Sequence, residues 1–239
     1  MMKSVLVFKF SNTETPGYLE SFLNARNISW QLVDLDAGQL VPDFNANISA
    51  IALMGGTMSV NDSLPWTAPM LMFIQQAIKA DVPVIGHCLG GQLLAKALGA
   101  RITDSECPEI GWAEVRLSAT REAEEWLGKI KEFEGFHWHF QTFNLPAYAV
   151  PILNSRYCDN QAFVFNDYHI GFQCHIEMTV LMVKQWCDDA EAVLNARKKI
   201  PPVQTKQQML QDVEARVAKL NNIADKVYER WLSKAALSF

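Results

Sequence analysis

VPVIGHCLGGQLLAKALGA, residues 82–100, places an apolar run, a group of glycines around Cys88 and a helix-forming stretch in direct succession. The apolar run predicts a buried strand at 82–87, and the leucine- and alanine-rich stretch predicts a helix at 90–99. Glycine tolerates the tight turn that the short connection between them requires. A buried strand that turns directly into a helix is the repeating step of an α/β sheet, so this stretch predicts that fold class.

The same alternation of apolar runs and amphipathic stretches continues along the chain. Further strands are predicted at SVLVFKF (4–10), ISWQLVDL (28–35), ISAIALM (48–54) and HIGFQCH (169–175). Further helices are predicted at TPGYLESFLNAR (15–26) and APMLMFIQQAIKA (68–80). Runs that are apolar throughout suit strands that are covered on both faces. We therefore predict a doubly wound, mostly parallel sheet with helices on both faces.

The C-terminal part of the chain has a different pattern. Two prolines in KKIPPVQ (198–204) cannot continue a helix, so we expect an α/β unit at 1–190 and a helical extension at 191–239. In the extension, apolar residues recur at alternating spacings of three and four: Leu210, Val213, Val217, Leu220, Ala224, Val227 and Trp231. Such a stripe needs a partner surface. That surface is the chain's own α/β unit, a second copy in a homodimer, or another protein.

Composition and charge restrict the function classes. With 239 residues, 49% of them hydrophobic, the chain can bury one sizeable core. Its net charge of -5 provides no basic surface for nucleic acid, so we expect a small-molecule substrate or a protein partner. The five cysteines are odd in number and form no CxxC pair, which argues against disulfides and structural zinc and favours the reducing cytoplasm. The N-terminal apolar run is too short for a signal peptide or membrane span.

Cys88 lies where a nucleophile would be exposed. Strand, Gly86-His87-Cys88-Leu89-Gly90 and helix together form the cysteine version of a nucleophile elbow, in which glycines let the chain turn sharply enough to present the side chain above the sheet. The N-terminus of the following helix favours the reactive thiolate. The alternative is that Cys88 is a small buried hydrophobic residue.

The stretch GFQCHIEMT (171–179) supplies a candidate base and its orienter. His175 and Glu177 are two apart on a predicted strand, so their side chains point to the same face. Glu177 can then accept a hydrogen bond from one imidazole nitrogen while the other nitrogen faces a thiol. The alternative is an ordinary pair of neighbours on an edge strand.

A third stretch, IALMGGTMSVND (51–62), is a buried strand that ends in two glycines. A turn of this kind can expose backbone N–H groups, which would form one half of an oxyanion hole. The N–H of Leu89, directly after Cys88, would form the other half. Taken alone, the two glycines can equally be a plain turn.

In this order and spacing, MGGTMSVND, GHCLGGQLLAKALGA and GFQCHIEMT resemble the three signature regions of class I, triad-type glutamine amidotransferases. The resemblance covers about residues 1–185, and the nearest group is the stand-alone one similar to the glutaminase domain of GMP synthetase. It implies a flavodoxin-like fold, with Cys88 as nucleophile, His175 as proton carrier and Glu177 as its orienter. It also implies that Gly56 and Leu89 form the oxyanion hole.

The resemblance further implies that Gln92 lies at the amino-acid end of the substrate, and we expect His139 and Phe140 beside it. Relatives typically carry Trp-His-Gly-Asp where this chain reads HWHFQTFNLP (137–146), so Phe140 and Gln141 replace glycine and aspartate. A phenylalanine there would reshape the subsite for free glutamine. His137 and His139 could pair on a metal, but the sequence offers no third ligand at metal spacing. We predict no metal and no cofactor.

Two activities fit these residues. The first is hydrolysis of the glutamine γ-amide to glutamate and ammonia, as in an ammonia-donating amidotransferase. The chain has neither a GxxxxGK[ST] loop nor a Ser-Gly-Gly-Val-Asp-type loop for an acceptor, so a synthetase would be a separate chain. The second is free-standing hydrolysis of γ-glutamyl peptides or amides with the same triad. A non-catalytic binding protein is the third alternative, which the complete Cys, His and Glu set disfavours.

Overall fold

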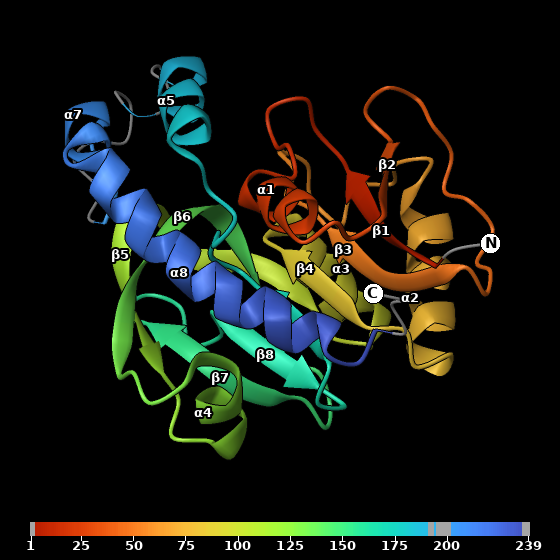
Figure 1. Cartoon of the computed structure of the whole chain (residues 1–239). Coiled ribbons are helices and arrows are strands. Elements are labelled where there is room, and N and C mark those ends of the chain that lie inside the picture. The colour runs from red at the N-terminus through yellow and green to blue at the C-terminus, as the bar shows by residue number, and fades with distance from the viewer. Residues whose placement is uncertain (1–2, 191–193, 195–201, 236–239) are drawn as a thin grey trace.

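The structure, a computed structural model, describes residues 3–190, 194 and 202–235. Over these ranges the chain forms a nine-stranded sheet in the order β2-β1-β3-β4-β9-β8-β7-β5-β6 (Figure 1). The strands are β1 (Ser4–Lys9), β2 (Trp30–Asp34), β3 (Ile48–Leu53), β4 (Val84–His87), β5 (Ile102–Leu117), β6 (Glu132–Phe143), β7 (Val150–Ser155), β8 (Ala162–Phe165) and β9 (His169–Phe172). Pairs from β2 across to β9 are parallel, and pairs from β9 across to β6 are antiparallel.

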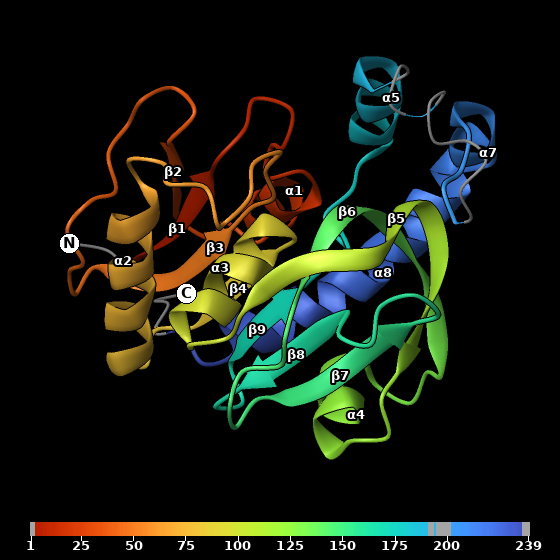
Figure 2. The same cartoon turned by 180° about the vertical axis from the view of Figure 1, so that it is seen from behind.

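Helices cover both faces of the sheet. They are α1 (Tyr18–Ala25), α2 (Thr67–Lys79), α3 (Leu89–Ala97), α4 (Arg121–Leu127), α5 (Val180–Asp189), α7 (Lys206–Leu210) and α8 (Val213–Leu232). Helices α1 and α8 lie in front of the sheet in Figure 1, whereas Figure 2 shows α2 and α3 on the opposite side. None of the helices described is both long and apolar enough to cross a membrane.

Strand β1 shows how the two faces form separate cores. Because successive side chains of a strand point to opposite faces, Val5 and Val7 pack in the core under α1 and α8. Leu6 and Phe8 pack in the core under α2 and α3. All four side chains are buried. The four consecutive apolar residues at 5–8 are therefore required by helices on both sides.

The predicted fold class is confirmed: the sheet is doubly wound, with helices on both faces, and a C-terminal helix is present. The predicted strands at 4–10, 28–35, 48–54 and 82–87 correspond to β1 to β4. The strand expected at 169–175 is shorter, because β9 ends at Phe172. The antiparallel half, β5 to β8, was not predicted, so the sheet is mixed.

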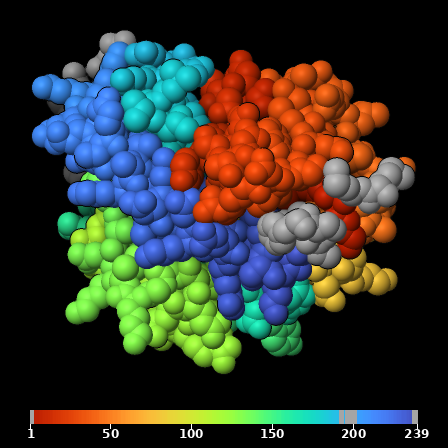
Figure 3. All heavy atoms as spheres, viewed as in Figure 1, coloured from red at the N-terminus to blue at the C-terminus, as the bar shows by residue number. Residues whose placement is uncertain are grey.

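The apolar stripe of the C-terminal region packs on the chain's own fold. Six of its seven members are buried and belong to the core that also contains Val5 and Val7: Val213, Val217, Leu220, Ala224, Val227 and Trp231. Figure 3 shows α8 as a band between the N-terminal part and the β5 to β7 region. The break expected at 198–204 falls largely outside the described residues.

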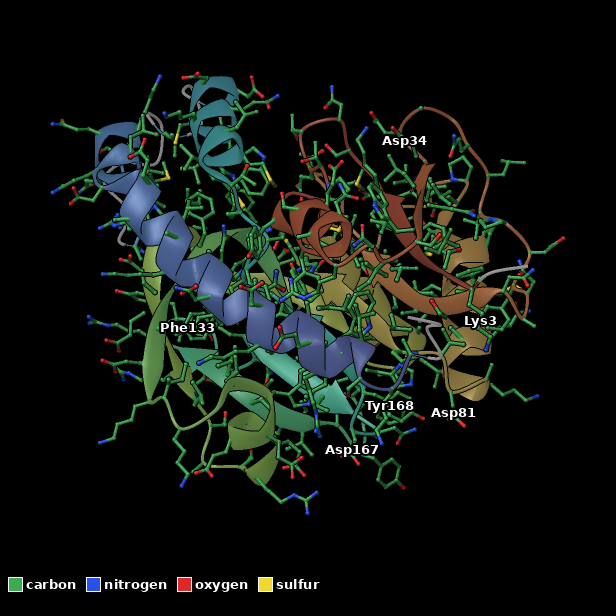
Figure 4. All side chains as sticks on the ribbon, in the orientation of Figure 1. Lys3, Asp34, Asp81, Phe133, Asp167 and Tyr168 are labelled. Carbon is green, nitrogen blue, oxygen red and sulfur yellow. The ribbon has the colours of Figure 1, made fainter. Side chains whose placement is uncertain are left out.

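A surface contact joins the β8–β9 turn to the connection before β4. The Tyr168 hydroxyl donates a 2.6 Å hydrogen bond to Asp81, and the two labelled side chains lie close together in Figure 4. This contact lies at the amino ends of β4 and β9. It leaves the carboxyl ends, where Cys88 follows β4, free to form a cavity.

Candidate active site

Cys88 occupies a strained turn between β4 and α3. Its φ of 48° and ψ of -105° lie in a region that side chains other than glycine rarely adopt. The flanking glycines permit this turn: a Cβ on Gly86 would overlap the carbonyl oxygen of Gly90, and a Cβ on Gly90 would overlap that of Leu53. Strain at a single reactive side chain beside a helix N-terminus is the geometry of a nucleophile elbow.

His175 and Glu177 form a tight buried pair next to Cys88. His175 Nδ1 lies 2.6 Å from Glu177 Oε1, and both side chains are about 1% exposed. Burial disfavours the charged imidazole, but the Glu177 carboxylate and the Cys88 sulfur outweigh it and hold the pKa of His175 well above its usual value. The pair therefore favours an imidazolium that can donate a proton.

The backbone around His175 differs from the predicted strand. His175 lies beyond β9 and makes one isolated bridge to β6, in which its N–H donates to the Phe136 carbonyl at 2.8 Å. The side chains of His175 and Glu177 nevertheless meet, as predicted. The regular strand from which this was predicted is absent, because β9 ends at Phe172 in the described chain.

His87 places a second imidazole on Glu177. Its Nδ1 lies 3.1 Å from Glu177 Oε2, and both side chains are buried. The two atoms are in contact but do not form a regular hydrogen bond. Burial raises the pKa of Glu177, but His175 and His87 together hold it well below its usual value. Glu177 is thus held as a carboxylate between two histidines.

Two glutamines form the wall beside the sulfur. Gln173 Nε2 lies 3.5 Å from Cys88 Sγ, and Gln173 Oε1 accepts a 3.1 Å hydrogen bond from Gln92 Nε2. Gln92 also reaches the carbonyl oxygen of Gln141 at 3.4 Å. The predicted substrate residue Gln92 is therefore fixed between Cys88 and the segment that carries Phe140.

Cys88 opens onto a cavity of about 330 Å³ at the carboxyl ends of the parallel strands. Every residue predicted for the oxyanion hole and the substrate lies on its wall: Gly56, Leu89, Gln92, His139 and Phe140. In the described part of the chain, the backbone N–H groups of Gly56 and Leu89 donate to no protein acceptor. Unpaired N–H groups on a cavity wall are what an oxyanion hole requires, so their role there stays a prediction.

Phe140 belongs to the cavity wall and not to the core. Its side chain is 38% exposed. Its neighbour Gln141 accepts from Ser59 Oγ at 2.6 Å and donates to Asp104 Oδ1 at 3.0 Å. Asp104 also lines the cavity. A carboxylate from β5 therefore lies next to Gln141, the position at which the family resemblance leads to the expectation of an aspartate.

His137 and His139 have a third neighbour that the sequence did not reveal. Glu109 of β5 lies with them, and the three residues offer ligand atoms within 4.8 Å of one another. The Glu109 carboxylate accepts hydrogen bonds from Ser155 at 2.7 Å and Gln161 at 2.7 Å, and lies 3.1 Å from His139 Nε2. The bonds from Ser155 and Gln161 fix the Glu109 carboxylate, and Glu109 in turn fixes the ring of His139. We therefore interpret the cluster as one that holds His139 in position on the cavity wall.

Glu14 is an acidic residue whose side chain reaches the cavity from the loop after β1. Its side chain is 8% exposed, and its Oε2 has no hydrogen-bond partner. A Cβ on Gly55 would overlap this oxygen and lie 3.2 Å from His175 Cε1, so the carboxyl group is close to the base. Burial raises the pKa of Glu14 to about 7, with His175 opposing and Glu177 adding to the shift.

Sequence reasoning missed His87, Gln173, Glu109 and Glu14. Two of them had a local signal, because His87 directly precedes the nucleophile and Gln173 lies two residues before the base. Glu109 and Glu14 had none. Their roles depend on contacts with residues far away in the sequence.

With this geometry established, comparisons with known proteins identify the class. The class-I glutamine amidotransferase family matches residues 18–182, and the chain belongs to this family. The predicted family is thereby confirmed.

Individual relatives agree with this assignment. The chain is 30% identical over 163 residues to the glutamine amidotransferase-like protein YfeJ of Salmonella typhimurium, over 66% of this chain and 67% of that protein. It is 29% identical over 152 residues to the glutamine-hydrolyzing GMP synthase of Vibrio cholerae, over 63% of this chain but 27% of that enzyme.

Two solved structures of glutamine amidotransferases have the same fold over nearly the whole chain. One from Methylobacillus flagellatus has a TM-score of 0.96 and 44% identity, over 100% of this chain and 98% of that one. One from Thermotoga maritima has a TM-score of 0.86 and 26% identity, over 97% of this chain and 99% of that one. These structures include the C-terminal region in the shared fold.

Proposed function

We propose that the protein hydrolyses the γ-amide of glutamine through a thioester on Cys88 and releases glutamate and ammonia. The observation that carries the proposal is the convergence of Cys88 on its strained turn with the buried His175–Glu177 pair, 2.6 Å apart. The matched GMP synthases are named as glutamine-hydrolyzing, which supports the same chemistry.

The residues divide the reaction between them. The thiol proton of Cys88 passes to His175, and the sulfur attacks the γ-carbonyl carbon. The carbonyl oxygen becomes negative and accepts hydrogen bonds from the N–H groups of Gly56 and Leu89. His175 then donates its proton to the amide nitrogen as the C–N bond breaks, and ammonia leaves. Water attacks the thioester, His175 takes its proton, and glutamate leaves with the thiol restored.

A second candidate activity uses the same steps on a larger substrate. Phe140 lines the glutamyl end of the cavity, and a γ-glutamyl peptide or amide can offset a poorer fit there through contacts of its amine part, which free glutamine lacks. An ammonia acceptor would require a separate synthetase chain or another partner. None of the five cysteines forms a disulfide in the structure, which is compatible with an enzyme that works in the reducing cytoplasm.

The test is glutamate release by the purified protein from glutamine and from a γ-glutamyl dipeptide. We expect Cys88→Ala to abolish release and to prevent labelling by a diazo-ketone analogue of glutamine. His175→Ala should lose nearly all activity, whereas Glu177→Ala should keep some, because it only orients the base. Equal labelling of wild type and Cys88→Ala would end the proposal.

A further inference from the structure

A second cavity, of about 190 Å³, adjoins the first on the side of His175. Its wall consists of Thr13, Glu14, Thr57, Trp138, Trp186, Asp189 and Ala190. Glu14, Thr57 and Trp138 line both cavities, so the two share a boundary. The nucleophile lines the first cavity, and the base lies against the wall of the second.

The position of the base assigns the second cavity to the leaving group. His175 packs edge-to-face on Trp186, with ring centroids 4.9 Å apart. In the proposed reaction His175 donates its proton to the departing nitrogen, so that nitrogen must lie on the His175 side of the scissile bond. A substituent on the nitrogen would then extend past His175 toward Trp186 and Glu14. The glutamyl part lies at the other end, with Gln92 and Phe140.

The chemistry of the wall points to a positively charged substituent. Two acidic residues, Glu14 and Asp189, line the second cavity, and no lysine or arginine does so among the described residues. The cavity also presents two indole rings, Trp138 and Trp186, which lie edge-to-face with centroids 6.0 Å apart. Indole rings and carboxylates are the groups that bind ammonium ions in proteins.

Glu14 supplies the independent observation that something binds here. A carboxyl group that is more than nine-tenths buried without a hydrogen-bond partner on Oε2 is costly for the fold. Its position is fixed, because Trp186 Nε1 donates a 2.8 Å hydrogen bond to the carbonyl of Thr13, directly before it. A bound ammonium group in the second cavity would place a positive charge beside this buried carboxyl group.

We propose that the second cavity is a leaving-group subsite for a positively charged amine, so that the preferred substrates are γ-glutamyl amides whose amine part carries an ammonium group. The inference rests on the proposed thioester hydrolysis. Cys88 forms the acyl bond, the C–N bond breaks, and the amine leaves with the proton from His175, its second amino group still charged beside Glu14.

The test compares γ-glutamyl amides of 1,3-diaminopropane, propylamine and β-alanine, whose free ends are positive, uncharged and negative. We expect kcat/KM to fall in that order, with at least a tenfold difference between the first and second. Glu14→Gln should reduce this ratio to threefold or less. Asp104→Asn is the matched control: it changes an acidic residue at the glutamyl end and should leave the ratio unchanged.

Binding to Cys88→Ala, measured by calorimetry with the first two amides, provides a second readout that needs no turnover. If no substrate is hydrolysed in a Cys88-dependent way, the proposed function fails. The difference in affinity between the diaminopropane and propylamine amides then decides by itself whether the subsite exists. The inference is overturned if the ammonium amide is preferred neither in rate nor in affinity, or if the preference survives in Glu14→Gln. Equal losses on all three amides in Glu14→Gln would also overturn it, because Glu14 would then act only through His175.

Discussion

At the scale of single residues, His87 distinguishes this site from a simple triad. Glu177 faces His175 at 2.6 Å through one oxygen and His87 at 3.1 Å through the other. His87 is itself enclosed by the rings of Phe172 and Tyr228, each with its centroid 6.0 Å away. His87 touches no reacting atom, so it is a positioning residue.

We expect His87→Leu to lower kcat about tenfold with KM nearly unchanged, because Glu177 loses one of the two groups that fix its orientation. His87→Asn should recover part of the loss, since its side-chain N–H lies near the position of Nδ1. Steady-state kinetics on glutamine or a γ-glutamyl dipeptide gives both constants. His169→Leu, in a buried histidine outside the site, is the control. A larger loss in that variant, or no recovery by asparagine, would show that His87 only fills space.

Phe140 is the residue that should control the choice between glutamine and larger substrates. It lies on the wall of the first cavity and is 38% exposed, so its removal should cost little stability. We expect Phe140→Gly to raise kcat/KM for free glutamine severalfold relative to a γ-glutamyl dipeptide, because free glutamine has no leaving-group contacts to hold the scissile bond when its glutamyl end is displaced, and small displacements change rates strongly. Leu145→Gly, in an exposed apolar residue outside the cavity, should not change the ratio. An unchanged ratio in Phe140→Gly with a lowered Tm would refute this role.

At the scale of secondary structure, α8 completes the core behind Cys88, His175 and Glu177. Tyr228 contacts His87 from one side, and its ring packs on Phe22 of α1 with centroids 5.2 Å apart. Its neighbour Trp231 is fully buried. The amphipathic pattern of α8 is therefore satisfied within the chain, and its apolar stripe is not available to a second copy.

Truncation of this helix face should be costly for the fold. We expect Trp231→Ala to lower the free energy of unfolding by about 3–5 kcal/mol, the usual cost of removing a buried aromatic ring. Lys226→Ala, on the exposed face of α8, should change it by less than about 0.5 kcal/mol. Urea unfolding measures both values. A cost below about 1 kcal/mol for Trp231→Ala would mean that α8 contributes little to the fold.

At the scale of the whole molecule, the sequence predicted what local patterns encode. The turn at Cys88 was predictable because Gly86 and Gly90 must be glycines for the chain to pass so close to itself. The parallel half of the sheet was predictable because β1, β3, β4 and β9 are buried on both faces, whereas the edge strand β2 is largely exposed. Strand β5 was not, since a register shift between Asp104 and Glu109 breaks its alternation and most of its first half is only partly buried or exposed.

The contacts that complete the site could not be predicted, because they join residues that are far apart in the sequence. Glu14 meets His175 across 161 positions of sequence, and His87 meets Glu177 across 90, distances at which spacing carries no information. The segment after β9 leaves the sheet because the N–H of His175 bonds to Phe136 on β6, which lies four strands away in the sheet order. Tertiary packing, and not secondary-structure propensity, determines both of these contacts and the path of the segment after β9.

The buried carboxyl of Glu14 should be visible in the stability of the whole protein. Its pKa is raised from 4.5 to about 7, so the folded state resists ionisation that the unfolded state permits. The contribution of protonated Glu14 to the free energy of unfolding is therefore fully present below pH 4.5 and is lost as the pH rises through 7. The side chain introduced by Glu14→Gln has no charge to bury. The substitution should therefore leave the free energy of unfolding nearly unchanged at low pH and increase it at high pH.

We expect the stability gain of Glu14→Gln over wild type to increase by about 2 kcal/mol between pH 5 and pH 8. Urea unfolding of both proteins at the two pH values measures it, and the other titrating groups largely cancel in the difference. Glu20→Gln, on the exposed face of α1, should show no such change. A gain independent of pH would mean that Glu14 is ionised at little cost. The fold would then bear no penalty at the second cavity, and the strongest reason for a cationic ligand there would be lost.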